Sequence, residues 1–271
     1  MAQHLMPANG DSPNAQEEPK TLVEGAYLQL RRDIIEGRHA PGTKLRVEHL
    51  KDTYQVGAGT LREALALLVS DTLVIAQGQR GFTVTPISVA DMEDITHTRV
   101  LLECEALRQS IKNGDEAWEG SLVSAFHRLT RAEEKLKDNV AATVNEWEER
   151  NRLFHETLIA ACPSRWTRQF LGVLYQQSER YRRISVMRRP IPRDVHEEHE
   201  AIFNAALARD SKLAVKVLTG HILRTLQAVR ALDALEMPPA EPGIRSGRNG
   251  DAAGAGKRAP GRATAARTRA D

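Results

Sequence analysis

Three histidines, His155, His199 and His221, interrupt or flank the apolar faces of predicted helices in the second half of the chain. A helix normally turns such a face toward the core, so these imidazoles are expected to be buried. Asn151 lies one turn before His155 and adds an amide to the same face. Imidazoles that converge from facing helices are how helical bundles build metal sites. The alternative for each histidine taken alone is a core or boundary side chain with a backbone partner.

Arg99 is another polar residue on an apolar helical face, which it shares with Met92, Ile95 and Ala106. A buried guanidinium is costly unless an anion compensates its charge. The planar fork of an arginine suits a bidentate contact with a carboxylate ligand. The alternative is a buried ion pair with Glu103, which lies one helical turn further along.

Other charged residues of this region are predicted at the surface. We expect His196 and Glu198 to be exposed to solvent. The run Arg180, Arg182 and Arg183 is predicted to form a solvated or subunit-facing surface, although one of its members could reach an internal cavity.

The stretch 88–236, which holds all these residues, predicts about six amphipathic helices and no strand. Breaks between helices are expected at KNGDE, near Ala141, at CPS, at RRPIP and at ARDSK. Ser88 follows Pro86 and is placed to cap the first helix. The pattern favours an all-α antiparallel helical bundle.

The stretch 21–86 predicts a different, smaller unit. Residues 22–36, VEHLKDTYQ and TLREALALLVSDTL predict three helices, and the third turns Leu61, Leu65 and Leu68 inward. The second and third helices, joined by a glycine-containing turn, form a helix-turn-helix pattern whose second member can enter a major groove. The runs LVIAQ and GFTVTP predict a β-hairpin, or wing. This spacing alone is also compatible with a purely structural unit.

The residues of this smaller unit closely resemble the winged-helix domain of GntR-family transcriptional regulators. The resemblance runs through LRRDIIEGRHAPGTKLRVEHL, VGAGTLREALALLVSDTLV and QRGFTVTPIS without a gap. It implies that the start of the third helix and the tip of the wing contact double-stranded operator DNA. Carried over by position, the implied DNA-binding residues are Arg46, Gly57, Gly59, Thr60, Arg62, Arg80 and Gly81.

One departure from the family pattern concerns DNA specificity. Many relatives carry Ser-Arg-Thr-Pro before the Leu-Arg-Glu-Ala-Leu core, whereas this chain has Gly57, Ala58, Gly59 and Thr60. The position of the arginine that often reads guanine is therefore Ala58. Glycines allow the backbone to approach phosphates, so we expect DNA binding to persist with a different base preference.

The helical stretch resembles the FCD ligand-binding domain of the FadR subgroup of the same family. The resemblance rests on N-x-x-x-H, E-H-x-x-I, a histidine in the final helix and RVLLE-x-x-A. It implies a divalent metal ion, zinc first with nickel or manganese as alternatives, held at Asn151, His155, His199 and His221. The family has Asp where this chain has Asn151, so we expect weaker metal affinity. The resemblance also implies that Arg99, with Glu103, faces the cavity of a small organic acid effector.

The chain of 271 residues is therefore divided into four parts: an N-terminal tail at 1–20, a winged helix-turn-helix domain at 21–86, an FCD domain at 87–237 and a Gly/Ala/Arg-rich tail at 238–271. Both tails are expected to be disordered. The C-terminal tail holds seven Lys/Arg and three Asp/Glu. It is either a solubilising extension or a nonspecific arm that attracts phosphates.

Composition excludes several classes. No stretch approaches the roughly 20 apolar residues of a membrane span, and aromatic residues make up 4% of the chain, which disfavours a stacking platform for single-stranded nucleic acid. Cys104 and Cys162 share no metal or redox spacing, and a reducing cytoplasm with free thiols is expected.

Together these features predict a ligand-responsive DNA-binding regulator, with repression favoured, of a catabolic operon. The chain looks most like regulators of dicarboxylate or amino-acid catabolism, glutarate-type repressors among them. A homodimer is expected, because two winged helices on a palindromic operator need two-fold symmetry. Two alternatives stay open: a metal-dependent enzyme and a purely structural metal-binding bundle. The enzyme is disfavoured because Ile159 stands where HExxH needs its second histidine.

Overall fold

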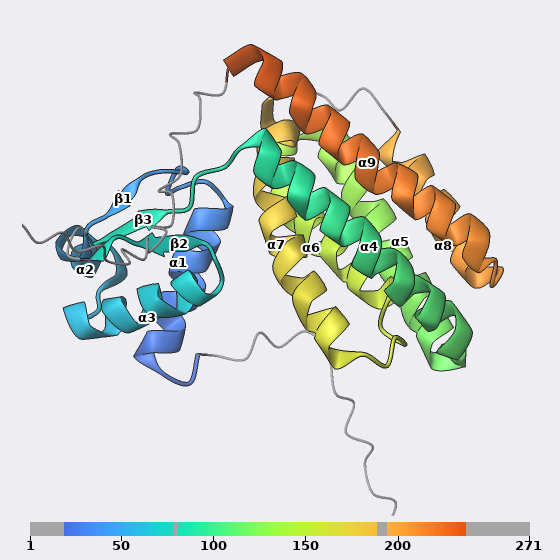
Figure 1. Cartoon of the computed structure of the whole chain (residues 1–271), viewed down its shortest axis with the longest axis horizontal. Coiled ribbons are helices and arrows are strands. Elements are labelled where there is room, and N and C mark those ends of the chain that lie inside the picture. Colours follow the sequence, from blue (N-terminus) through green and yellow to red (C-terminus); the bar gives the residue numbers. More distant parts are fainter. Residues whose placement is uncertain (1–18, 79–80, 189–193, 237–271) are drawn as a thin grey trace, which may run out of the picture. The chain divides into compact units, whose positions relative to one another are not determined.

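The computed structural model describes residues 19–78, 81–188 and 194–236. Residues 1–18 of the predicted N-terminal tail, the whole predicted C-terminal tail, Arg80 at the wing tip and residues 189–192 of the predicted break at RRPIP lie outside these ranges. Within them the structure is mainly helical, with one small antiparallel sheet (Figure 1). This confirms the predicted fold class.

The winged-helix region contains α1 (Leu22–Ile35), β1 (Lys44–Leu45), α2 (Val47–Tyr54), α3 (Ala58–Ser70), β2 (Val74–Ala76) and β3 (Phe82–Val84). Its helices enclose a core to which α3 contributes Leu61, Leu65 and Leu68, each fully buried as predicted. Two details differ from the prediction. Helix α3 begins at Ala58, because Gly57 is extended and forms its N-cap.

The second difference is an additional strand. The predicted wing strands pair antiparallel, with Val74 opposite Val84. The short strand β1 pairs with the other edge of β3, with Leu45 opposite Phe82, which gives the strand order β1-β3-β2. A strand of two residues has no alternating pattern long enough to be recognised in the sequence.

The helical region contains α4 (Val89–Asn113), α5 (Glu116–Asp138), α6 (Val140–Leu158), α7 (Arg165–Arg188), α8 (Val195–Leu207) and α9 (Ser211–Glu236). Helix α4 packs against α7 and α9, α5 against α6 and α8, and α8 against α9 (Figure 1). As predicted, the side chain of Ser88 caps α4 by accepting a hydrogen bond from the amide of Asp91. Four helix breaks fall where the sequence placed them, between α4 and α7 and between α8 and α9.

The core of the helical region reaches into every one of its helices. Fully buried apolar residues include Leu107 of α4, Leu122 of α5, Phe154 of α6, Leu171 of α7 and Leu218 of α9. No helix in the described residues has the length and apolar character of a membrane span. Both cysteines are buried free thiols.

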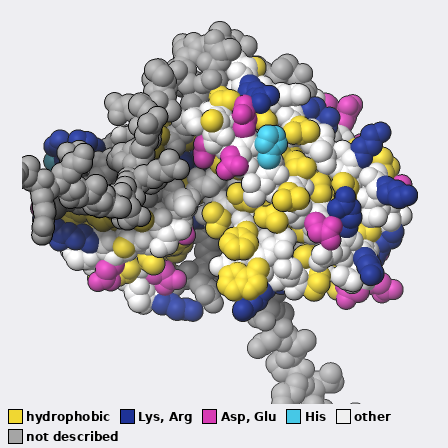
Figure 2. All heavy atoms as spheres, in the orientation of Figure 1, with side chains coloured by type: hydrophobic (Ala, Val, Ile, Leu, Met, Phe, Trp, Pro, Cys, Tyr) yellow, Lys and Arg dark blue, Asp and Glu magenta, His cyan; other side chains and the backbone are white. Residues whose placement is uncertain are grey.

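Some large hydrophobic residues of the helical region remain at the surface. They include Leu101 of α4 and Leu213 and Leu223 of α9. In Figure 2, hydrophobic side chains gather in the area where Figure 1 shows α4. Such a gathering is a feature of surfaces that contact another protein.

Candidate metal and ligand site

The three predicted histidines lie together inside the helical region. His155 comes from α6, His199 from α8 and His221 from α9. All three are buried, and each offers a ring nitrogen within 4.8 Å of those of the other two. The ring centroids of His199 and His221 are 4.7 Å apart. The sequence pattern could place these residues on apolar faces, but only the packing of α6, α8 and α9 brings the imidazoles to one point.

Each histidine donates a hydrogen bond from Nδ1 to a glutamate carboxylate. The pairs are His155 with Glu103 at 2.7 Å, His199 with Glu133 at 2.6 Å and His221 with Glu198 at 2.8 Å. A carboxylate on Nδ1 fixes the ring orientation and places the proton on that nitrogen. Nε2 then carries a free lone pair and is the atom that can bind a metal ion.

The Nε2 atom of His199 provides a direct test of this arrangement. It is buried and has no hydrogen-bond partner among the described residues. A buried polar atom without a partner is costly and calls for an explanation. A metal ion bound between the three imidazoles would satisfy this nitrogen, so the side chains present fit the metal that the sequence implies.

The electrostatics of His155 also suit a metal ligand. Burial lowers the pKa of His155 to about 4, even though Glu103 opposes the change. Burial acts in the opposite direction on Glu103, but Arg99 and His155 outweigh it and hold the pKa of this carboxyl at about 2. Near neutral pH the pair is therefore a neutral imidazole and a carboxylate, the protonation states that metal binding requires.

Arg99 is buried, and its guanidinium is already engaged. Its Nε and Nη2 donate to Glu103 Oε2 at 3.2 and 2.9 Å, and it lies over the ring of Tyr175, 5.0 Å from the centroid. The ion pair that the sequence left open as an alternative is thus present. Glu103 accepts from Arg99 and His155 at once, so Arg99 contacts the histidine cluster through this carboxylate.

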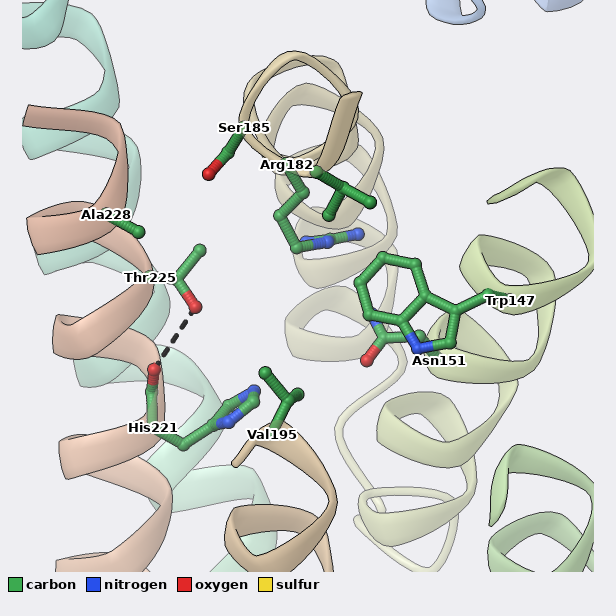
Figure 3. A pocket seen from close by; sticks show the side chains of 9 residues that line it. Trp147, Asn151, Arg182, Ser185, Val195, His221, Thr225 and Ala228 are labelled. Atoms are coloured by element: carbon green, nitrogen blue, oxygen red, sulfur yellow. Dashed lines mark hydrogen bonds between the residues drawn. The ribbon is translucent and has the colours of Figure 1, made fainter. Parts of the chain in front are cut away.

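A pocket lies beside the histidine cluster, between α6, α7, α8 and α9 (Figure 3). It encloses about 360 Å³, including space open to solvent. Its lining residues are Trp147, Asn151, Arg182, Ser185, Val186, Val195, His221, Thr225 and Ala228. Asn151 and His221, two of the four predicted metal ligands, therefore face it.

Arg182 lines this pocket, so it is the member of the arginine run that reaches a cavity, which the sequence left open as the alternative to a solvated or subunit-facing surface. Its Nε and Nη2 donate to Glu148, at 3.2 and 2.8 Å to Oε2. Although burial opposes the change, Glu148 raises the pKa of Arg182. Burial raises the pKa of Glu148 above its usual value, although Arg182 acts in the opposite direction. Because the guanidinium keeps its proton and donates to both oxygens of Glu148, we take the pair as two opposite charges.

Trp147 lines the pocket and carries an unpaired donor. The residue is 3% exposed, and its Nε1–H has no hydrogen-bond acceptor among the described residues. Buried indoles usually find a partner for this group. Figure 3 shows the indole ring beside Asn151, with the edge of its six-membered carbon ring, and not its nitrogen, nearest the space that the lining residues surround. The sequence showed Trp147 on the buried face of α6 but gave no sign of this role.

The carboxylates that hydrogen-bond His199 and His221 were not predicted from the sequence. The side chain of Glu198 is 10% exposed and bonds both His221 and Arg224, so its predicted solvent exposure was wrong. His196 is partly buried and shares Glu133 with His199. Glu133 and Glu198 lie in the charged runs RAEEK and HEEHE, where an inward glutamate resembles its exposed neighbours. The available signal was their helical spacing relative to buried positions.

The residues assigned to DNA contact lie at the surface of the winged-helix region. Arg46, Gly57, Gly59 and Arg62 are exposed, and Thr60 and Gly81 are partly exposed. Gly81 has φ of +89°, a conformation that a side chain would strain. Thr60 falls in the first turn of α3, where free backbone N–H groups favour anions, and Arg62 follows two residues later.

Two family descriptions match the chain. "Bacterial regulatory proteins, gntR family" matches residues 22–84, and "FCD domain" matches residues 94–224. Two curated relatives are similar over most of their own length. The HTH-type transcriptional regulator BphR of Paraburkholderia xenovorans is 49% identical, over 80% of this chain and 88% of its own. The HTH-type transcriptional repressor GlaR of Escherichia coli is 31% identical, over 78% and 96%.

A solved structure has the same fold at low sequence identity. E. coli McbR/YncC superposes with a TM-score of 0.67 at 18% identity, covering 79% of this chain and 99% of that one. The family matches and the curated relatives describe transcriptional regulators and no enzyme, which confirms the expectation that this protein is not an enzyme. The chain belongs to the GntR family of bacterial transcriptional regulators, with an N-terminal helix-turn-helix domain followed by an FCD domain.

Proposed function

We propose that the protein represses a catabolic operon and leaves its operator when a small organic acid binds at a metal site in the helical domain. The observation that carries this proposal is the buried histidine cluster beside the pocket. Three imidazoles share one point, each is oriented by a carboxylate, and His199 Nε2 has no partner in the described residues. A metal ion bound between the imidazoles would account for this arrangement.

The metal ligands in this proposal are Asn151, His155, His199 and His221, and the ion is divalent, with zinc favoured. Three neutral imidazoles and one amide oxygen leave the full charge of the ion uncompensated by its ligands. Such an ion attracts the carboxylate of an effector as a further ligand. Asn151 is 4% exposed and lines the same pocket as His221, which supports a role for its amide oxygen as a ligand of the ion.

Arg99 and Glu103 are proposed to act on the effector through His155. Glu103 Oε2 accepts from Arg99, while Oε1 accepts from His155. Arg99 is not among the described residues that line the pocket. This differs from the direct clamp that the sequence suggested, because the planar fork of Arg99 already faces Glu103.

The proposed contacts with DNA are made by α3 and the wing. Arg62, Thr60 and Arg46 would contact phosphates or bases, with Gly57, Gly59, Gly81 and Arg80 allowing or making close contacts. The family binds operator DNA typically as dimers. We propose that two copies associate so that two α3 helices meet successive major grooves, and the exposed leucines of α4 and α9 provide one surface for that association.

A promoter-binding assay tests the proposed function. The protein's own promoter is labelled, and its fluorescence anisotropy is followed as full-length protein is added, then as a panel of organic acids is titrated, with and without a chelator. The proposal expects tight promoter binding and release by at least one acid only when metal is present. Binding no tighter than to random DNA would contradict the regulator, and release unaffected by the chelator would contradict the metal site.

A further inference from the structure

The pocket has two chemically different ends (Figure 3). Near one end are His221 and Asn151, which belong to the proposed metal site. At the other end, Ser185 and Ala228 lie with Arg182 between the two helices α7 and α9. If a carboxylate of the effector occupies the metal end, the rest of the effector molecule extends toward Arg182.

Arg182 is the one lining residue, among those described, whose side chain always carries a positive charge. Its charge is already matched by Glu148, through contacts at 2.8, 3.2 and 3.3 Å. The side chain of Glu148 is fully buried and that of Arg182 is 11% exposed, so solvent screens this pair only slightly. A second ligand carboxylate here would lie next to the Glu148 carboxylate, with one guanidinium shared between two anions.

The remaining wall of the pocket suits an uncharged group. Val186, Val195 and Ala228 are apolar, and Trp147 presents its indole. The unpaired Nε1–H of Trp147 is a neutral donor. A hydroxyl or carbonyl oxygen on the effector would satisfy this donor without adding charge.

We infer that the pocket selects an acid with a single carboxylate, whose remaining body is uncharged and largely apolar. The inference rests on the proposed function, since it assumes that the carboxylate meets the metal ion. It departs from the dicarboxylate preference that the sequence resemblance suggested, because Arg182, the cation able to hold a second carboxylate, is neutralised by Glu148. The Arg182–Glu148 pair is the element that sets this specificity.

The experiment compares acids of equal length that differ in the second carboxylate. Metal-loaded full-length protein is titrated by calorimetry with hexanoate against hexanedioate, butanoate against butanedioate, and benzoate against benzene-1,4-dicarboxylate. We expect at least one monocarboxylate to bind, and to bind 10-fold or more tightly than its dicarboxylate partner. Equal or tighter binding of the dicarboxylates would overturn the inference and leave the proposed acid effector intact. Failure of every acid to bind would overturn both.

A charge-removing variant tests the mechanism of selection. Glu148→Gln leaves the charge of Arg182 without its partner. The second carboxylate of a dicarboxylate can then take the place of the Glu148 carboxylate. We expect the preference to shift toward the dicarboxylate by 10-fold or more. Glu149→Gln, a neighbour whose side chain is 42% exposed, is the control and should keep the wild-type preference. A Glu148→Gln protein that binds ligands with the wild-type preference would overturn the role of the pair. The wild-type titrations test the inference should this variant not fold.

Discussion

Glu103 joins Arg99 to His155: Oε2 accepts from the arginine at 2.9 and 3.2 Å, and Oε1 accepts from the imidazole at 2.7 Å. One fully buried carboxylate thus neutralises the charge of Arg99 and fixes the ring of a proposed metal ligand. Any change in this carboxylate should therefore appear in the metal affinity, although Glu103 itself is not a proposed ligand.

Glu103→Gln should weaken metal binding by about 10- to 100-fold, the usual effect of removing a carboxylate that orients a ligating histidine. Metal affinity is measured by competition with a chelating dye. Glu105→Gln is the matched control, since Glu105 lies on the same helix with its side chain 55% exposed. A Glu103→Gln protein with wild-type metal affinity would show that the orientation of His155 does not depend on this contact.

Arg99→Ala should lower the free energy of unfolding by about 3–5 kcal/mol, because it leaves the Glu103 charge buried and unpaired. The loss is expected without any effector, and urea denaturation of the purified protein measures it. Arg108→Ala, which removes an exposed arginine of the same helix, should change stability by less than about 0.5 kcal/mol. Unchanged stability combined with lost effector affinity would instead support a direct clamp on the effector.

His199→Ala should remove the metal ion, and Asn151→Asp should tighten its binding by adding a negative charge to the ligands. Elemental analysis of protein purified without chelators gives the metal content, expected at about one ion per chain for one four-ligand site. His97→Ala is the control, because His97 is exposed on α4. Equal metal content in the His199→Ala and His97→Ala proteins would refute the site.

Trp147→Phe should weaken the binding of an effector that carries a hydroxyl or carbonyl group by roughly 10-fold, the scale of one neutral hydrogen bond of about 1–1.5 kcal/mol. Phenylalanine places a smaller aromatic ring there, so much of the apolar wall is kept. Titration calorimetry measures the affinity, and Trp166→Phe, whose residue is 54% exposed, serves as the control. Equal losses in both variants would contradict a specific role for the Trp147 donor.

Arg62→Ala should weaken binding to specific and random DNA alike and lower the salt dependence by about one phosphate contact. Anisotropy titrations at several salt concentrations measure both effects. Arg131→Ala removes an exposed arginine of α5 and should leave DNA binding unchanged. A loss confined to one DNA sequence would instead assign Arg62 to base recognition.

The sequence predicted the fold and the histidine cluster for the same physical reason. Apolar periodicity decides which face of a helix is buried, and His155, His199 and His221 lie on or beside such faces. The carboxylates could not be predicted in this way. Glu133 and Glu198 occur in runs of charged residues, and only tertiary packing decides which member of a run turns inward.

Arg182 and Arg99 show that the sequence also could not identify the partners of buried basic residues. The sequence identified Arg99 as buried but could not decide whether its partner was a ligand or Glu103. For the run that holds Arg182 it favoured a solvated or subunit-facing surface, and it could not decide which member would reach a cavity. The partner of Arg182, Glu148, lies on a different helix, so no local pattern links the two residues.

The central claim is that metal and a small acid, bound together at the histidine cluster, release the protein from its operator. The most direct measurement is the anisotropy of labelled promoter DNA during titration with an acid that binds wild-type protein, repeated with His199→Ala. We predict that wild-type protein dissociates as the acid is added, while His199→Ala binds the promoter with similar affinity and stays bound. Release of His199→Ala at the wild-type acid concentration would contradict the account.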